Sequence, residues 1–185
     1  MTKGAAAREL LPFHGERVLL RDVRREDADL LDEWNAALEP DSFNDFGPRA
    51  PTDRDALARG PLRNERNGTL IIERIEDSQP LGTIAYRRVS FGPPPNSDAW
   101  QLGIDLAAEA RGQGYGTEAQ RLLADWLFAT TPANRVEAAT DIENVAEQRS
   151  LEKAGYVREG VLRGSQFRAG AYHDLVYYSR LRDDP

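Results

Sequence analysis

Seven consecutive residues have the types and spacing of a site for a negatively charged ligand. Three glycines within five residues free the backbone to adopt positive φ and to approach a ligand closely. Good helix formers follow at residues 117–128, so the loop leads into a helix N-terminus, whose free N–H groups and positive dipole end suit a phosphate. An arginine adds a fixed positive charge. The seven are Arg111, Gly112, Gln113, Gly114, Tyr115, Gly116 and Thr117.

The patterns around this loop predict the elements that position it. Residues 100–106 read as a strand that runs directly toward the loop, and Gly103 within it indicates a bulge or a close approach. The helix at 117–128 carries an apolar stripe at helical spacing. Elsewhere the patterns predict strands at 17–23, 69–74, 81–89, 135–140, 156–162 and 174–181, and helices at 24–34, 52–58 and 145–154.

Composition and charge argue against several classes of function. The chain has 185 residues, 40% hydrophobic and 30% charged, which suits one domain with a real core. A net charge of −7 argues against wholesale nucleic-acid binding, which rests on basic patches. With no cysteine and two histidines, we expect no disulfide, no thiolate chemistry and no metal site. No apolar run reaches membrane length and no signal-peptide core is evident, so we expect a cytoplasmic protein.

Three phosphate-binding motifs compete for the loop. A Walker P-loop requires Gly-Lys followed by Ser or Thr, and this loop has no lysine. Residues 114–119 match the dinucleotide pattern G-x-G-x-x-A, and Glu137 follows at about the expected distance. However, seven residues separate Leu106 from Gly114, and the chain beyond is too short for a doubly wound sheet. The third pattern, R-x-x-G-x-G, is met by residues 111–116.

In its setting, the third pattern resembles the acetyl-CoA pyrophosphate loop of the GNAT N-acetyltransferase superfamily. The strand at 100–106 resembles the bulged strand of that fold, and Asn144 with residues 150–156 resembles the segment that flanks the pantetheine arm. The end of the chain resembles the closing strands of the Rim-type branch, which includes enzymes that acetylate ribosomal-protein N-termini. These closing matches are residues 160–163, 172–174 and 178–179.

The resemblance covers nearly the whole chain and implies a single domain. The implied fold is α/β (α+β): a mixed, mostly antiparallel central sheet with a bulged strand at the CoA site, flanked by helices. The GNAT domain would span residues 16–182, with an N-terminal tail at 1–15 and a C-terminal tail at 183–185.

The resemblance implies an acyl-CoA-dependent N-acetyltransferase with acetyl-CoA as co-substrate. It would move an acetyl group, by direct attack, to a primary amine of a protein N-terminus or of an antibiotic, amino sugar or polyamine. Asn144 could instead be a plain helix N-cap with Glu147 closing a capping box, and the two roles are compatible. The expected cofactor-binding residues are Ile104, Leu106, Arg111, Gly112, Gln113, Gly114, Tyr115, Gly116, Thr117 and Asn144.

This chain lacks the residues that usually protonate the leaving thiolate in the family. Many members carry a tyrosine seven residues after the asparagine, where this chain has Leu151. The Rim-type branch often has a serine three residues after it, where this chain has Glu147. Ser150 lies one turn further on and is our candidate acid, with a plain helix-surface serine as the alternative. Tyr156 stands where the family usually has phenylalanine, so we expect its ring in the core.

Several side chains at strand ends are candidates for the general base. Gln101 stands where some relatives carry a glutamate base. Asp105 adjoins the expected bulge and is our candidate, while Glu137 and Asp141 could act directly or through a water. A surface carboxylate is the ordinary alternative for each. His173 could also serve, although its place on a closing strand favours a structural role.

We expect the acceptor pocket in the irregular segment 38–68, which prolines and glycines interrupt. It carries Asp41 and Asp45, and Phe43 and Phe46, whose rings we expect in the core. The expected partner is a small-molecule or peptide amine, with no nucleic acid and no membrane; pairing through sheet edges would give a homodimer. A second hypothesis is a GNAT-fold protein that binds acyl-CoA or sequesters a small ligand without turnover, because the usual tyrosine and serine are missing.

Overall fold

The computed structural model describes residues 12–38, 42–43, 50–93 and 96–185. The strands are β1 (Phe13–His14), β2 (Val18–Asp22), β3 (Asn67–Arg74), β4 (Pro80–Ser90), β5 (Asp98–Leu106), β6 (Arg135–Asp141), β7 (Val157–Arg168) and β8 (Ala171–Leu181). The helices are α1 (Ala28–Ala36), α2 (Arg54–Arg59), α3 (Tyr115–Thr130) and α4 (Val145–Lys153), with 3-10 turns η2 (Arg25–Asp27) and η3 (Ala108–Ala110).

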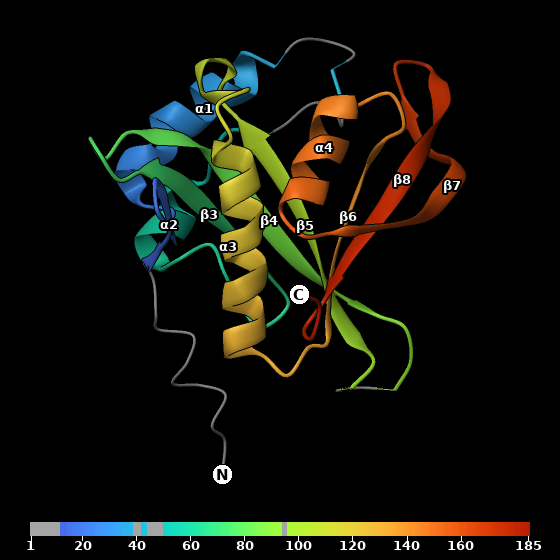
Figure 1. Cartoon of the computed structure of the whole chain (residues 1–185). Helices are drawn as coiled ribbons and strands as arrows, with labels where there is room; N and C mark the ends of the chain where they lie inside the picture. Colours follow the sequence, from blue (N-terminus) through green and yellow to red (C-terminus); the bar gives the residue numbers. More distant parts are fainter. Residues whose placement is uncertain (1–11, 39–41, 44–49, 94–95) are drawn as a thin grey trace.

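In the described part of the chain the strands form one sheet of eight, in the order β1-β2-β3-β4-β5-β6-β8-β7. Neighbouring strands are antiparallel except for β5 and β6, which are parallel. Helices α3 and α4 lie in front of the sheet in Figure 1, with β4 and β5 passing behind α3. This mixed, mostly antiparallel sheet with flanking helices confirms the predicted fold class.

The main core lies between α3 and the sheet. The helix buries Leu123, Trp126 and Leu127, each at most 2% exposed. Tyr86 on β4 meets the rings of Trp100 and Trp126 edge-on, with centroids 5.4 Å apart in both pairs. Burial of such side chains stabilises the fold by about 1.5–3 kcal/mol each, so α3 is held firmly on the sheet along its length.

Alternation along the central strands divides their side chains between the two faces of the sheet. Tyr86, Trp100 and Leu102 belong to the core that α3 covers. Successive strand residues point to opposite faces, so Arg87 and Gln101 project from the other face, where the Nε of Arg87 donates to the Oε1 of Gln101 at 2.7 Å. The face that α3 covers is therefore apolar, and the opposite face carries polar side chains.

Strands β5 and β6 separate from each other after three residue pairs. Their pairing runs from Trp100 with Val136 to Leu102 with Ala138. Beyond that point β5 continues beside β4, without a register shift, as far as Leu106, while β6 continues beside β8. The irregularity expected in this strand therefore lies on its β6 side, as a fork whose inner edges have backbone groups without a strand partner.

The two ends of the sheet extend beyond the predicted strands. β1, within the segment expected as a tail, pairs with β2 through Phe13 and Leu20. At the other end the hairpin of β7 and β8 runs to Arg168, around a two-residue turn in which Ala169 and Gly170 both have positive φ. Two positive φ values are typical of the type I′ turn, which continues the twist of a hairpin.

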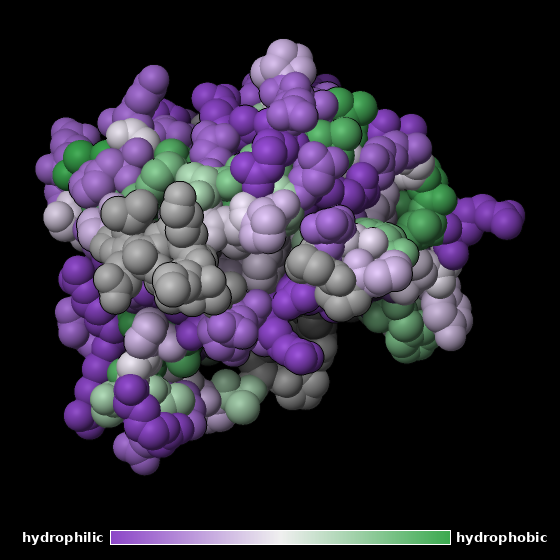
Figure 2. Space-filling model, turned by 90° about the horizontal axis from the view of Figure 1, so that it is seen from below, coloured by the Kyte–Doolittle hydropathy of each residue, from purple (hydrophilic) through white to green (hydrophobic). Residues whose placement is uncertain are grey.

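The surface is polar over most of the view from below. Hydrophilic residues dominate that face, and hydrophobic residues appear there in small separate groups (Figure 2). Within the described residues, no helix combines the length and apolar composition needed to cross a membrane.

Candidate active site

The glycine loop has the backbone geometry of an anion cradle. Gly112 and Gly114 have φ of +70° and +84°, a region that side chains other than glycine rarely adopt. Gly114 is the N-cap of α3, which begins at Tyr115, two residues earlier than predicted. A Cβ on Gly112 would meet nothing within 4 Å, so the loop leaves open space at this point. The free N–H groups in the first turn of a helix such as α3 are suited to an anion.

Side chains from the loop itself fix its shape. The Nε of Arg111 donates to the carbonyl of Leu106 at the end of β5, at 2.9 Å. The Nε2 of Gln113 donates to the carbonyl of Glu109 at 2.6 Å. The terminal nitrogens of Arg111 make no hydrogen bond or ion pair with the described residues, so the guanidinium is held at its base with its charged end available.

A clasp formed by Arg17 and Glu118 ties the loop to the start of β2. One oxygen of the Glu118 carboxylate accepts the backbone N–H groups of Glu16, Arg17 and Val18, at 2.7, 2.8 and 3.2 Å. Both terminal nitrogens of Arg17 donate to the carbonyl of Gln113 at 3.1 Å. Sequence patterns did not reveal this clasp, because its partners lie about one hundred residues apart.

A cavity of about 420 Å³ lies between the loop, β5 and α4. Gly116 lets these elements approach, because a Cβ there would lie 3.2 Å from the Cδ1 of Leu106. Of the predicted cofactor-binding residues, Gln113 turns toward Glu109 and Tyr115 packs beneath the guanidinium of Arg17, 4.8 Å from ring centroid to Cζ. The others line the cavity: Ile104, Leu106, Arg111, Gly112, Gly114, Gly116, Thr117 and Asn144.

Asn144 is the N-cap of α4. Its Oδ1 accepts the N–H of Glu147 at 3.3 Å, and its Nδ2 donates to the Oγ1 of Thr140 on β6 at 3.0 Å. The N-cap prediction is confirmed, but the predicted capping box is wrong. The carboxylate of Glu147 turns away from the cap and accepts from the Nε2 of Gln120 on α3, at 2.5 Å.

Ser150 lies in the same cavity, at the contact between α3 and α4. Its Oγ is 2.9 Å from the Oγ1 of Thr117 and 3.4 Å from the Oε1 of Gln120. It is half-buried rather than a surface serine. Behind these residues the ring of Tyr156 is buried, which confirms its predicted place in the core.

Glu147 is a residue of this cavity whose pKa is clearly shifted. Burial raises the pKa of its carboxyl from 4.5 to about 7, and the hydrogen bond from Gln120 only partly opposes this. Near pH 7 a large fraction of this carboxyl therefore carries a proton. The sequence showed Glu147 as a departure from the family pattern and as a candidate for a capping box. It did not show a buried acid, since the burial of Glu147 depends on a contact between two helices.

Asp105 lies in a neighbouring cavity of about 280 Å³, between the end of β5 and α1, where Thr83 and Trp34 also contribute. The two cavities share four lining residues: Leu38, Ser42, Leu106 and Arg111. The structure therefore does not bring the candidate base Asp105 and the candidate acid Ser150 into one cavity.

A third cavity, of about 710 Å³, opens on the face of the sheet away from α3. Gln101 is fully engaged there: its Oε1 accepts from Arg87 and its Nε2 donates to the hydroxyl of Tyr177 at 2.7 Å. The Tyr177 hydroxyl lies 3.3 Å from the Oε1 of buried Glu137. Burial, with the nearby Glu137 carboxylate, raises the pKa of Tyr177. Glu137 in turn pairs with the Nε of Arg135 at 2.8 Å.

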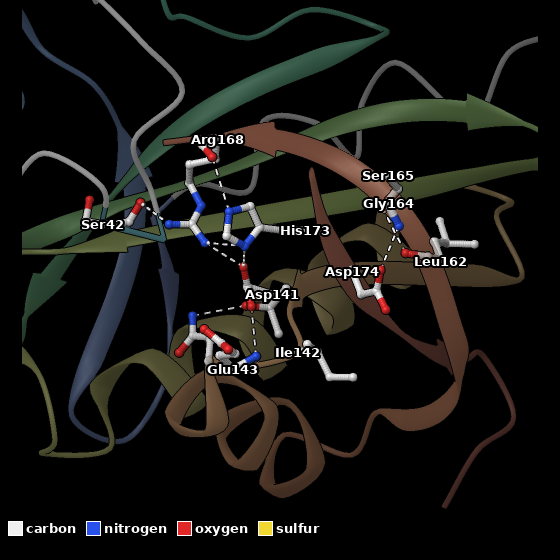
Figure 3. Close-up of polar contacts among 12 residues, drawn as sticks. Ser42, Asp141, Ile142, Glu143, Leu162, Gly164, Ser165, Arg168, His173 and Asp174 are labelled. Atoms are coloured by element: carbon white, nitrogen blue, oxygen red, sulfur yellow. Dashed lines mark hydrogen bonds and ion pairs between the residues drawn. The ribbon is translucent and has the colours of Figure 1, made fainter. Parts of the chain in front are cut away.

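Asp141 is the centre of a buried polar cluster at the end of β6 (Figure 3). Its Oδ2 accepts from the Nη2 of Arg168 at 2.5 Å and lies 3.3 Å from the Nδ1 of His173. Its Oδ1 accepts the N–H of Glu143 at 2.8 Å. Asp141 thereby anchors the β7–β8 hairpin, and His173 has the structural role that its position favours.

Phe43 lines both the first and the third cavity. Its ring lies 5.2 Å from the guanidinium carbon of Arg168 and is 39% exposed. The prediction that Phe43 packs in the core is therefore wrong, since the ring borders two cavities instead. Asp41, Asp45 and Phe46 lie outside the described residues.

Residues 17–157 match the acetyltransferase (GNAT) domain family, a span that includes the glycine loop, both separating strands and α4. The chain belongs to the GNAT acetyltransferase family.

The relatives of this GNAT chain carry acetyltransferase names. It is 27% identical to the uncharacterized N-acetyltransferase p20 of Bacillus licheniformis, over 92% of this chain and 96% of p20. It is 31% identical to the probable N-acetyltransferase YjcK of Bacillus subtilis, over 88% and 86%. The chain is thus an acyl-CoA-dependent N-acetyltransferase.

Solved GNAT structures with different bound ligands share the fold. Mycobacterium smegmatis RimJ in complex with CoA-disulfide has a TM-score of 0.71 at 24% identity, over 90% of this chain and 82% of RimJ. Vibrio cholerae spermidine N-acetyltransferase in complex with CoA and spermine has a TM-score of 0.71 at 18% identity, over 92% and 98%. At these identities the likeness shows the GNAT fold alone.

Proposed function

We propose that this GNAT chain transfers an acetyl group from acetyl-CoA, bound on the α3 side of the sheet, to a primary amine that enters from the opposite side. The observation that carries this proposal is the fork between β5 and β6, which has a cavity on each side and Phe43 at the border of both. A fork of this kind lets two substrates meet through the sheet.

On the donor side, the pyrophosphate binds the N–H groups at residues 112–117 and the charged end of Arg111. The open space beside Gly112 accommodates the phosphate oxygens at close range. The amides of the pantetheine arm bond to the unpaired inner edges of β5 and β6, as an added strand would. Asn144, whose amide already bonds to Glu147 and Thr140, keeps further lone-pair capacity for that arm.

On the acceptor side, the buried carboxylates near the cavity already have cationic partners. Glu137 pairs with Arg135, and Asp141 pairs with Arg168. A polyamine gains its affinity from carboxylates that are not yet neutralised. This pairing supports an acceptor with one reacting amine, such as a protein N-terminus, over a polyamine.

For proton transfer we keep Asp105 as the proposed base and Ser150 as a proposed acid. Asp105 lines neither the donor cavity nor the cavity on the acceptor side, so it would act on the amine through a water rather than by direct contact. The amine nitrogen attacks the carbonyl carbon of the thioester and gives up a proton, through the water, to Asp105. The tetrahedral intermediate then re-forms its carbonyl and the C–S bond breaks; the electron pair goes to sulfur, which takes a proton from the acid.

Titration calorimetry with acetyl-CoA tests the donor half of the proposal. We expect one site per chain, and a folded protein that does not bind would refute the proposal. Thiol release from acetyl-CoA in the presence of short peptides with different N-terminal residues, and of spermidine, then tests the acceptor half. Turnover with a peptide supports the proposal, turnover with spermidine alone contradicts the acceptor class, and binding without turnover of any amine supports the ligand-sequestering alternative.

A further inference from the structure

Among the described residues that line the donor cavity, Glu147 is the one with a carboxyl group. The other side chains there are apolar, amide, hydroxyl or cationic. The proposed function gives this carboxyl no role and assigns leaving-group protonation to Ser150, although a hydroxyl is a far weaker acid than a carboxyl.

Gln120 holds the Glu147 carboxyl in place. The side chain of Gln120 is fully buried within α3, at 0% exposure. Its Nε2 donates to the Oε1 of Glu147 at 2.5 Å, while its Oε1 accepts from the hydroxyl of Ser150 at 3.4 Å. One Glu147 oxygen is therefore committed to an acceptor role, which leaves the other to carry the proton toward the cavity.

The charged groups around Glu147 do not neutralise it. Three cationic residues line the same cavity, and within the described part of the chain none of them forms an ion pair with Glu147: Arg111, Arg149 and Lys153. The buried phenol of Tyr156 lies on the other side, where it faces the carbonyl of Gln120 at 3.5 Å.

We propose that the Glu147 carboxyl is the general acid that protonates the sulfur of coenzyme A as the acetyl group leaves. The tetrahedral intermediate reforms its carbonyl, the C–S bond breaks, and its electron pair goes to sulfur, which takes the proton from the Glu147 carboxyl. The resulting carboxylate is reprotonated from solvent before the next cycle. This assignment rests on the proposed function, because it requires the pantetheine arm to enter this cavity.

The direction of this transfer is favourable. A carboxyl whose pKa is about 7 is a stronger acid than a thiol, for which the ordinary value is about 8.5. A serine hydroxyl is a far weaker acid than either. In this assignment Ser150 positions Gln120 and the carboxyl rather than donating the proton itself.

The decisive measurement is the ultraviolet thiolate titration of coenzyme A bound to the protein, which needs no acceptor. Once ionised, Glu147 would repel a thiolate nearby and raise the pKa of the bound thiol. We expect Glu147→Gln to lower that pKa by about one relative to wild type. The matched control is Glu143→Gln, which removes an exposed glutamate before α4 and should leave the thiol titration unchanged.

Turnover gives the second measurement, with whichever amine releases thiol from acetyl-CoA. We expect Glu147→Gln to lower kcat about 100-fold, with an unchanged KM for acetyl-CoA, and Glu147→Asp to restore part of the loss. If Glu147→Gln binds CoA with neither the thiol titration nor kcat altered, the inference is wrong, and so it is if Ser150→Ala abolishes turnover while Glu147→Gln keeps it. Failure of wild type to bind CoA would instead remove the proposed function.

Discussion

Gly114 provides a sharp test of the phosphate loop. A left-handed backbone costs a residue with a side chain about 1–2 kcal/mol, and Gly114 has φ of +84° at the N-cap of α3. Gly114→Val must either bear this strain or abandon the conformation. Its Cβ would also lie 3.1 Å from the Nη2 of Arg17, which holds the adjacent carbonyl of Gln113.

The strain gives an estimate of the effect. If the free loop relaxes and ligand binding must restore it, 1–2 kcal/mol corresponds to a CoA affinity roughly 5- to 30-fold weaker. Displacement of Arg17 and loss of close approach by the backbone add to this. If the loop stays in place, the same strain appears as a lower melting temperature, by about 2–8 °C for a chain of this size.

Titration calorimetry with CoA, together with a thermal melt, measures both quantities. The matched control is Gly170→Val in the turn between β7 and β8, where φ is +78° and a Cβ would meet nothing within 4 Å. It should lose similar stability and keep its CoA affinity. A folded Gly114→Val protein with wild-type affinity would refute the proposed role of the loop.

Three further predictions concern Arg168, Glu147 and Asp105. Arg168→Met leaves Asp141 buried without its cation, so the free energy of unfolding should fall by about 3–5 kcal/mol in denaturant titrations; a smaller loss than about 1 kcal/mol would contradict the anchoring role. The raised pKa of Glu147 means that the folded state binds its proton more tightly, so stability from this group is lost as pH rises from 4.5 to about 7. Melting temperatures across that range should show the loss in wild type and not in Glu147→Gln. Asp105→Asn should lower kcat for the amine that turns over; an unchanged kcat would assign the base elsewhere.

The sequence predicted the elements that flank the loop because their signals are local. Glycine spacing marked the loop, and apolar periodicity marked α3 and the central strands. The extension of β7 and β8 to the turn at Ala169–Gly170 was missed, since alanine is not a usual residue at positive φ. Strand β1 was missed because two residues are too few to show alternation.

The proton-transfer residues were harder to predict than the loop. A polar residue within a helix reads as exposed, yet Gln120 is fully buried because α4 supplies it with partners. The protonation of Glu147 depends on that same burial, and the separation of Asp105 from Ser150 depends on where β5 departs from β6. These are properties of contacts between elements, which spacing along one element does not contain.

The clasp of Glu118 makes the start of β2 a reporter of the donor site. Since one carboxylate oxygen in the first turn of α3 holds the amides of residues 16–18, these amides can exchange with solvent only when the clasp opens. Opening it also releases the hold of Arg17 on the loop carbonyl of Gln113. A ligand that rigidifies the loop should therefore slow deuterium uptake at the N-terminal edge of the sheet, on peptides that never touch the ligand.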